Sequence, residues 1–437
     1  MRAVKAYVEG VLIIAGWLVL YLAQDRTLGA DGLARYQALR QLLEQHQMPD
    51  TIYSLIGPLF ATPLWMLGNV AGDVEGWLRA YNVVIFGLGL LITWLMLRDR
   101  MDRDLLRRFL LLLVAGSMIA PHVNNFYGET FTMLGVGLGI LAACARYSKT
   151  GWAFVVLGAA NTPASLVGLG LVSAYETLRA KRLRFLLPLA IAGVLVLGEI
   201  ALRRGFASEY TNNVVIAKTV MPYSGLDGFS YPFFFGVLAI LFSFGKGLVF
   251  YLPGLLLPVR KRLREMHDPA RVDLYRAYVL WMLFLAGLVI AYASWWSWYG
   301  GDWWGPRFFL IGILPASLAL AVALSYERAS WLANLATLGV LALSLWIGAD
   351  SLVLGTYWPG QCFVNYYQYA FLCHFTPEFS SLWYPFVNSP SYDPRLWLFA
   401  YYGVVLLWLA VPLTARLLDQ AFEAALPAIK QARGIRL

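Results

Sequence analysis

Two basic residues inside apolar segments have the type and setting to bind a phosphate. Arg307 closes the Trp-rich stretch 295–307 and enters the next apolar run with no basic cluster nearby. A lone cation at that depth is costly unless it meets an anion, so a phosphate ligand is favoured over an arginine that reaches for lipid headgroups. Lys246 lies between Gly245 and Gly247 in another apolar run, and the two glycines allow a ligand to approach closely. The spacing differs from that of a nucleotide-binding phosphate loop, so nucleotide binding is unsupported.

Further charged residues stand at the outer ends of apolar runs. Arg203 and Arg204 end one run, where they either anchor the helix to lipid headgroups or have a functional role. Glu129 opens another run, and an acidic residue stabilises a helix N-terminus electrostatically. His122 lies in the turn before Glu129, where an interfacial histidine is the commoner role. The 4 histidines form neither a zinc-protease motif nor a Ser-His-Asp pattern.

An amphipathic helix is predicted directly after the first apolar run, lying in the membrane interface rather than crossing it. One face carries hydrophobic residues at helical spacing, namely Leu33, Tyr36, Leu39 and Leu43. Asp31 stands at the N-terminal edge of this helix, and Arg35 follows four residues later on the same face. Taken alone, the segment leaves two interpretations of Asp31 open: a helix cap, or a carboxylate with a function.

The composition is that of a polytopic membrane protein. Of the 437 residues, 60% are hydrophobic and 14% are charged, which is far too apolar for a soluble domain of this size. Residues 7–23 lack a small-residue cleavage pattern and are predicted to form the first transmembrane helix rather than a signal peptide. The net charge of +9 reports membrane topology through the positive-inside rule, and no nucleic-acid partner is expected.

The basic clusters and the apolar runs together predict about ten full spans, with both termini in the cytoplasm. Each run is long enough to cross a hydrocarbon layer about 30 Å thick. The predicted spans are residues 7–23, 78–97, 109–123, 127–145, 183–202, 232–256, 277–294, 308–325, 331–349 and 396–414. The predicted fold class is therefore an all-α polytopic membrane bundle, formed by one domain over residues 1–437.

Two apolar segments do not fit as simple crossings. Residues 53–71 are interrupted by glycine and proline and are predicted to form short juxtamembrane helices in a first external loop, residues 24–77. Residues 152–175 lie between cytoplasmic clusters and contain an Asn-Thr-Pro break that begins at Asn161. This pattern predicts an in-and-out pair of half-helices that lies beside an internal cavity.

Two of the 3 cysteines lie together in another predicted external loop, residues 350–395. Cys362 and Cys373 are disulfide candidates, and a bridge would stabilise the loop by roughly 3 kcal/mol if the loop is extracytoplasmic. Cys144 lies inside a predicted span and is expected to be a packing residue. So few cysteines exclude a disulfide scaffold and a cysteine-rich metal site.

Three stretches resemble segments of the GT-C-fold glycosyltransferases, in the branch that holds the dolichyl-phosphate-mannose protein mannosyltransferases and the lipid A aminoarabinose transferase. The first is an external Asp followed by an Arg-Tyr helix and a Tyr- and Pro-rich segment, residues 31–63, and the others are residues 242–248 and 298–308. Unlike many members, this chain is shorter and has no separate soluble periplasmic domain after the spans. The resemblance implies a bacterial inner-membrane enzyme of cell-envelope glycan biosynthesis, with its active site facing the periplasm or cell exterior.

This resemblance implies transfer of a sugar from a polyprenyl monophosphate to an acceptor hydroxyl, with inversion at the anomeric carbon. It implies that Asp31 is the general base, and that cations stabilise the leaving phosphate in place of a general acid. The candidates for the donor phosphate are Lys246, Arg307, Arg203 and Arg204. The candidates for sugar or acceptor binding are Glu129, Arg35, Tyr36, His122, Trp298 and Asp302. The acceptor is a glycan, a lipid or a protein, and the prenyl tail is expected in a groove beside the half-helices. No cofactor is expected, and a divalent metal is left open.

A transporter or flippase of a lipid-linked sugar is the main alternative, because buried charges and interrupted spans also occur in transporters. The enzyme is favoured because the candidate charges cluster at the external face and because no paired interrupted helices of an inverted repeat are evident. A membrane acyltransferase is a third option. It would need a catalytic histidine, and only His122 is near a suitable position.

Overall fold

A computed structural model describes residues 2–22, 28–49, 51–206, 224–268, 270–301, 304–354, 360–388 and 394–432. Within these ranges the chain forms α-helices and short 3₁₀ helices and contains no strand. Up to residue 206 the elements are α1 (Arg2–Leu22), α2 (Ala30–Glu44), α3 (Ile56–Leu59), α4 (Thr62–Ala71), α5 (Val74–Arg79), α6 (Tyr81–Leu97), α7 (Arg103–Ala115), α8 (Ala120–Val123), α9 (Gly128–Cys144), α10 (Ser148–Ala160), α11 (Ser165–Ala180), η1 (Leu183–Leu186) and α12 (Leu187–Phe206). The later elements are α13 (Phe233–Phe242), α14 (Leu248–Tyr251), η2 (Pro253–Leu256), α15 (Arg260–Glu265), α16 (Leu274–Ala293), η3 (Arg307–Gly312), α17 (Ile313–Ser325), α18 (Trp331–Val353), η4 (Gly360–Phe363), α19 (Val364–Tyr367), α20 (Ala370–Phe375), η5 (Pro377–Phe379), α21 (Tyr384–Val387), η6 (Pro394–Leu398) and α22 (Phe399–Ala432).

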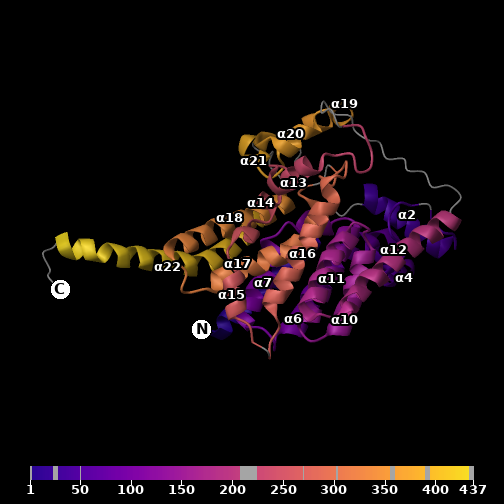
Figure 1. Ribbon diagram of the computed structural model, residues 1–437. Helices are drawn as coiled ribbons and strands as arrows, with labels where there is room; N and C mark the ends of the chain where they lie inside the picture. The colour runs from indigo at the N-terminus through magenta and orange to yellow at the C-terminus, as the bar shows by residue number, and fades with distance from the viewer. Residues whose placement is uncertain are drawn as a thin grey trace.

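Six helical segments in the described part of the chain are long and apolar enough to cross a membrane. They are Ala3–Leu22, Leu183–Gly205, Leu274–Ala293, Arg307–Ser325, Trp331–Val353 and Arg395–Ala425. Three shorter apolar helices, α6, α9 and α13, accompany them. The prediction of an all-α integral membrane protein is therefore confirmed. In the bundle, α2 and α4 lie at the end opposite to α15, and α22 runs out beyond the other helices (Figure 1).

Two segments predicted as continuous spans are interrupted. The run 109–123 is divided between α7 and α8, and the run 232–256 between α13, α14 and η2. In the second run the backbone becomes extended at Ser243, directly after α13. A Cβ on Gly247 would lie only 2.3 Å from the Ser243 carbonyl oxygen, so the tight bend depends on glycine. Lys246 therefore lies in a loop between helices rather than within a helix.

The segment 152–175 forms two helices, α10 and α11, with a break at residues 161–164. Packing of α10 is mainly against α9, and packing of α11 is mainly against α16. The α9–α10 contact is close: a Cβ on Gly158 would lie 2.6 Å from the backbone nitrogen of Val136. The break after α10 consequently lies beside the start of α9.

A helix is present where the amphipathic helix was predicted, as α2, and the short helices α3, α4 and α5 follow it in the first loop. The predicted apolar face is only partly correct, because Leu33 is exposed and the buried face includes Arg35. Leu39 of α2 is fully buried and packs in a small cluster with Trp65 of α4 and Phe126 of the α8–α9 turn. The N-cap of α2 is Gly29, with no side-chain cap hydrogen bond. The interpretation of Asp31 as the helix cap is therefore wrong, because Asp31 lies inside the first turn.

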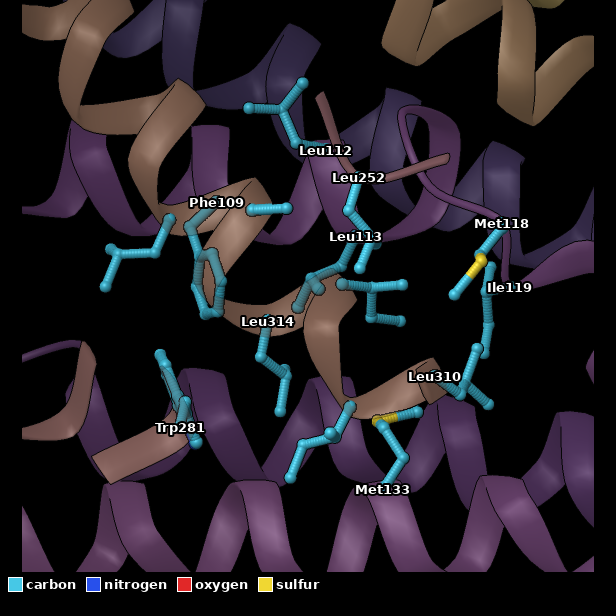
Figure 2. Packing of buried hydrophobic residues seen from close by; sticks show 14 of the residues in the cluster. Phe109, Leu112, Leu113, Met118, Ile119, Met133, Leu252, Trp281, Leu310 and Leu314 are labelled. Carbon is cyan, nitrogen blue, oxygen red and sulfur yellow. The ribbon is translucent and has the colours of Figure 1, made fainter. Parts of the chain in front are cut away.

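The main hydrophobic core surrounds α17, and 89% of the span that contains it is buried. Figure 2 shows Leu310 of η3 and Leu314 of α17 among side chains that include Phe109, Met133 and Trp281. These neighbours come from α7, α9 and α16. Because η3 begins at Arg307, this packing fixes the backbone of Arg307 at the edge of the core.

Candidate active site

Arg307 lies between two carboxylates from distant parts of the chain. Its Nη1 is 2.8 Å from Oδ2 of Asp31, and its Nε is 3.7 Å from Oε1 of Glu129. Asp31 lies in the first turn of α2, Glu129 lies in the first turn of α9, and Arg307 begins η3. The side chains are largely buried, with exposed fractions of 9% for Arg307, 22% for Asp31 and 16% for Glu129. Three residues singled out for separate reasons thus form one charged cluster.

Tyr53 and Arg35 complete the surroundings of Asp31. The Tyr53 hydroxyl donates to Oδ1 of Asp31 at 2.7 Å, and the Arg35 guanidinium lies 4.8 Å from the centre of the Tyr53 ring. Burial alone would raise the pKa of Asp31. The two arginines and the Tyr53 hydroxyl outweigh burial and hold this pKa below the usual 3.8, so Asp31 is ionised at neutral pH. Burial and the Asp31 charge raise the pKa of Tyr53, which therefore stays a hydrogen-bond donor.

Glycines leave room for both arginines. A Cβ on Gly128 would lie 2.6 Å from Nη2 of Arg35, whose Nη1 donates to the Ser54 carbonyl at 3.3 Å. In the turn before η3, Gly300 has a φ of 75°, a conformation that glycine adopts at no steric cost. A Cβ there would lie 3.0 Å from Cγ of Arg307. The guanidinium positions thus depend on the absence of side chains at these two glycines.

Asn161, at the break after α10, ties the first loop to the start of α9. Its side-chain oxygen accepts a hydrogen bond from the backbone nitrogen of Gly57 at 2.9 Å. Its Nδ2 donates to the Gly128 carbonyl and to Oγ1 of Thr132, both at 3.0 Å. Because Asn161 is 1% exposed, these bonds form away from solvent and hold the helix that carries Glu129 against the loop that carries Asp31.

The end of α12 holds the segment 51–55. Glu199 accepts hydrogen bonds from Oγ of Ser54 at 2.7 Å and from the next backbone nitrogen at 2.5 Å. Arg203 donates to the carbonyl of residue 51 and lies 3.6 Å from Glu199. Arg203 was a candidate for the donor phosphate. In the structure it binds the first loop and does not join the cluster around Arg307. Arg204, the adjacent candidate, is exposed on α12.

Lys246 lies next to the turn that carries Arg307. Its Nζ donates to the carbonyls of Gly301 and Gly305, each at 3.0 Å, and the residue is 4% exposed. His122 is also buried and interacts electrostatically with both Arg307 and Lys246. Its Nε2 has no hydrogen-bond partner among the described residues. An anion near His122 would therefore be attracted by both cations.

Other candidates lie apart from this cluster. The Tyr36 ring packs against Trp65, with 5.9 Å between ring centres, on the α2 face that contacts α4. Trp298 is buried, and its ring centre is 5.6 Å from that of His374. Both residues therefore have packing roles in this structure. Asp302 lies outside the described residues.

A disulfide joins Cys362 to Cys373 in the segment after α18. The residue after Cys373, His374, accepts a hydrogen bond at its carbonyl from the backbone nitrogen of Gly245 at 2.9 Å. Oγ of Ser380 donates to the carbonyl of Phe244 at 2.9 Å. The disulfide-bonded segment therefore packs on the loop that contains Lys246.

A small cavity adjoins Glu129 among α9, α16 and η3, with a volume of about 20 Å³. Its polar lining comes from Glu129, Thr132, Thr162 and Ser165. This volume holds about one water molecule and is far too small for a sugar. A sugar would therefore not fit this cavity unless its lining side chains moved.

Three residues of this region were not singled out as functional from the sequence: Tyr53, Asn161 and Glu199. Glu199 was detectable, because a carboxylate in an apolar run four residues before Arg203 suggests an ion pair along one helix face. Within the described ranges, no three histidine, cysteine or acidic side chains lie together as metal ligands. Comparisons with protein-family models, curated proteins and solved structures give no match.

Proposed function

We propose that this chain is an inverting glycosyltransferase with a GT-C-like bundle of about ten spans and a half-helix pair. It moves a sugar from a polyprenyl monophosphate to an acceptor hydroxyl at the external face of the bacterial cytoplasmic membrane. The observation that supports this proposal is the convergence of Asp31, Glu129 and Arg307. Such a reaction needs a carboxylate to accept a proton and a buried cation to stabilise a leaving phosphate, and this cluster contains both.

In the proposed reaction, Asp31 accepts the proton of the acceptor hydroxyl while the hydroxyl oxygen bonds to the anomeric carbon. The bond between that carbon and the phosphate oxygen breaks, and the polyprenyl phosphate leaves with the electron pair. Arg307 stabilises the developing charge on this phosphate, so no separate general acid is required. Because Arg307 contacts Oδ2 of Asp31 at 2.8 Å, we propose that donor binding draws the guanidinium towards the phosphate and frees Oδ2.

The neighbouring residues have supporting roles in this proposal. Lys246 adds a positive charge near Arg307, and His122 adds a polar nitrogen. Both support placing the donor phosphate on the side of the cluster where Lys246 and His122 lie. Glu129 binds hydroxyls of the sugar or acceptor once Arg307 has moved. Arg35 holds the first loop and adds positive charge beside Asp31. Arg203 holds segment 51–55 in place and is no longer proposed as a phosphate ligand.

Release of free polyprenyl phosphate is the measurement that tests this function. The purified protein would be given a panel of synthetic polyprenyl-phosphate sugars with acceptor mixtures, and wild type would be compared with Asp31→Asn. We expect one donor to be turned over, and the variant to lose at least roughly 10²-fold in turnover while keeping its donor affinity. Asp73→Asn is the matched control, because Asp73 caps α5 in the same loop and lies outside the cluster.

Two outcomes would contradict the proposal. Full turnover by Asp31→Asn would remove Asp31 as the base. Movement of labelled lipid-linked sugar across sealed vesicles, without release of polyprenyl phosphate, would instead establish the alternative of a transporter or flippase.

A further inference from the structure

A groove separate from the candidate active site opens between α1 and α22. The two helices touch where the Tyr401 hydroxyl donates to the Leu12 carbonyl at 3.1 Å. The groove is lined by α1 residues before Leu12 and by α22 residues after Tyr401, and it has a volume of about 960 Å³. Its lining comes from α1, α7, α22, the end of α17 and the turn after α17, with Val4, Lys5, Glu9, Asp104, Arg108, Leu324, Glu327, Val404, Leu407, Trp408, Leu409, Val411, Pro412 and Arg416. This volume is within the range of a small-ligand site.

One wall of the groove is a row of apolar side chains on α22. Val404, Leu407 and Val411 recur along this helix, with exposed fractions of 52%, 64% and 58%. They lie within a segment that is long and apolar enough to cross a membrane. In a bilayer this wall faces lipid, so hydrocarbon chains are its natural neighbours.

Two arginines lie where the groove meets the end of α17. Arg108 donates to Oγ of Ser325 at 2.7 Å, and Arg416 donates to the Tyr326 carbonyl at 2.8 Å. Arg416 also donates to the carbonyls of Leu324 and Pro412 and interacts electrostatically with Glu327, but among the described residues neither arginine has a carboxylate within ion-pair distance. Lys5, which also lines the groove, is paired with Asp104 at 3.4 Å. The two guanidiniums therefore keep charge available for an anionic group such as a phosphate.

A buried carboxylate in the same lining lacks a hydrogen-bond donor. Glu9 is 0% exposed, and its Oε2 accepts from Nε of Arg107 at 2.6 Å. Its Oε1 has no hydrogen-bond partner within the described ranges. A buried acceptor without a partner is costly, so a ligand that brings an N–H donor to Oε1 is favoured. Glu9 also lies within the span Ala3–Leu22, where a carboxylate is by default a candidate functional residue.

We propose that this groove binds one phospholipid whose headgroup joins a phosphate to a primary ammonium, the phosphoethanolamine class. The phosphate meets Arg108 and Arg416, the ammonium donates to Oε1 of Glu9, and an acyl chain lies along α22. The lining carries three basic and three acidic side chains, which matches a zwitterion better than a net anion. A choline headgroup has no N–H for Glu9, and a glycerol headgroup has no cation. The inference does not depend on the proposed glycosyltransferase activity.

The test measures which lipid stays bound to the detergent-purified full chain. The protein would be incubated with equal amounts of phosphatidylethanolamine, phosphatidylcholine, phosphatidylglycerol and undecaprenyl phosphate, and retained lipid would be counted by native mass spectrometry. We expect roughly tenfold preference for phosphatidylethanolamine over phosphatidylcholine in wild type, because one headgroup supplies a charged hydrogen bond that the other lacks. In Glu9→Gln this preference should fall to within about twofold.

A second variant guards against misfolding of Glu9→Gln. Val411→Trp fills the groove from a lipid-facing position and should lower retention of every lipid. Leu418→Trp is its control, because Leu418 is 71% exposed on the same helix and is absent from the groove lining. The proposal is overturned if the protein retains an equal amount of phosphatidylglycerol, phosphatidylcholine or undecaprenyl phosphate. It is also overturned if a folded Glu9→Gln variant keeps the preference for phosphatidylethanolamine over phosphatidylcholine. Equal lipid retention by Val411→Trp and Leu418→Trp would overturn it as well.

Discussion

Nη1 of Arg307 lies 2.8 Å from Oδ2 of Asp31, and the same guanidinium lies 3.7 Å from Glu129. This one cation therefore lies close to two carboxylates in a largely buried cluster, where charges interact more strongly than in water. Any anion that attracts Arg307 weakens its hold on Asp31. The basicity of Asp31 consequently depends on the position of Arg307, in addition to the effects of Arg35 and Tyr53.

Replacing Arg307 should reduce catalysis more than binding. We expect Arg307→Gln to lower turnover by roughly 10² to 10³, because it removes a cation from the leaving phosphate. Arg307→Lys should recover part of this loss, since it keeps the charge but not the planar pair of donors. Steady-state release of polyprenyl phosphate measures both. Arg204→Gln, on the exposed side of α12, is the control, and equal turnover in Arg307→Gln and Arg204→Gln would contradict the role.

The acid limb of kcat/KM should report the lowered pKa of Asp31. Because this pKa is below 3.8 in the free protein, the ionised carboxylate persists as the pH falls from 7 and is lost only below 3.8. The stability that its ion pair contributes is lost over the same acid range. Tyr53→Phe removes one hydrogen bond to Asp31 and should therefore raise the apparent pKa of this acid limb by roughly half to one pH unit. A limb near the ordinary histidine pKa of about 6.5, unmoved in Tyr53→Phe, would point to another titrating group.

Gly128→Ala should affect function without unfolding the protein. The new Cβ would meet the terminal atoms of Arg35, which are the flexible end of a long side chain, so the guanidinium is displaced from beside Asp31. We expect turnover to fall by roughly tenfold, which corresponds to about 1.4 kcal/mol. The melting temperature should fall by only a few degrees, because Arg35 loses a single hydrogen bond, to the Ser54 carbonyl. Gly170→Ala is the matched control, because a Cβ there meets nothing within 4 Å. A Gly128→Ala variant as active as Gly170→Ala would argue against a role for Arg35.

Asn161→Ala should destabilise the protein by about 1 to 3 kcal/mol, because it leaves the buried Gly57 nitrogen and Gly128 carbonyl without their shared partner. Thr132→Val removes one of the three bonds of Asn161, together with the bond between the Thr132 and Thr162 hydroxyls, but keeps the bonds from Asn161 to Gly57 and Gly128 and should cost less. Reversible unfolding in mixed detergent, followed by tryptophan fluorescence, would rank the two variants. If Thr132→Val proved the more damaging, the link between the first loop and α9 would have to lie elsewhere.

Much of the charged cluster could be predicted from the sequence because its members stand at conspicuous places. Asp31, Glu129 and Arg307 each occupy the end of an apolar or amphipathic segment, where a charge is costly unless it has a partner or a function. The sequence gives no distances between such ends. The partners they find in the fold therefore emerge only when α2, α9 and η3 pack together.

The weaker predictions concern residues whose role depends on local backbone. Lys246 was expected in a span, facing a ligand. The bend at Gly247 instead places it in a loop, where its Nζ donates hydrogen bonds to two backbone carbonyls. Arg203 was expected to meet lipid or phosphate, but the loop that binds it comes from 152 residues earlier in the chain. Periodicity describes helix faces, whereas such contacts are set by how irregular segments fold back onto helices.

The pairing of Asp31 with Arg307 also has a consequence for biosynthesis. The arginine is translated roughly 280 residues after the aspartate, which at a synthesis rate of about 5 to 20 residues per second is a delay of roughly 15 to 55 s. During that interval the first loop exists without the cation that later offsets its carboxylate. The N-terminal spans must therefore insert while this loop is still hydrated. The ion pair between Asp31 and Arg307 can form only after the ribosome has translated η3.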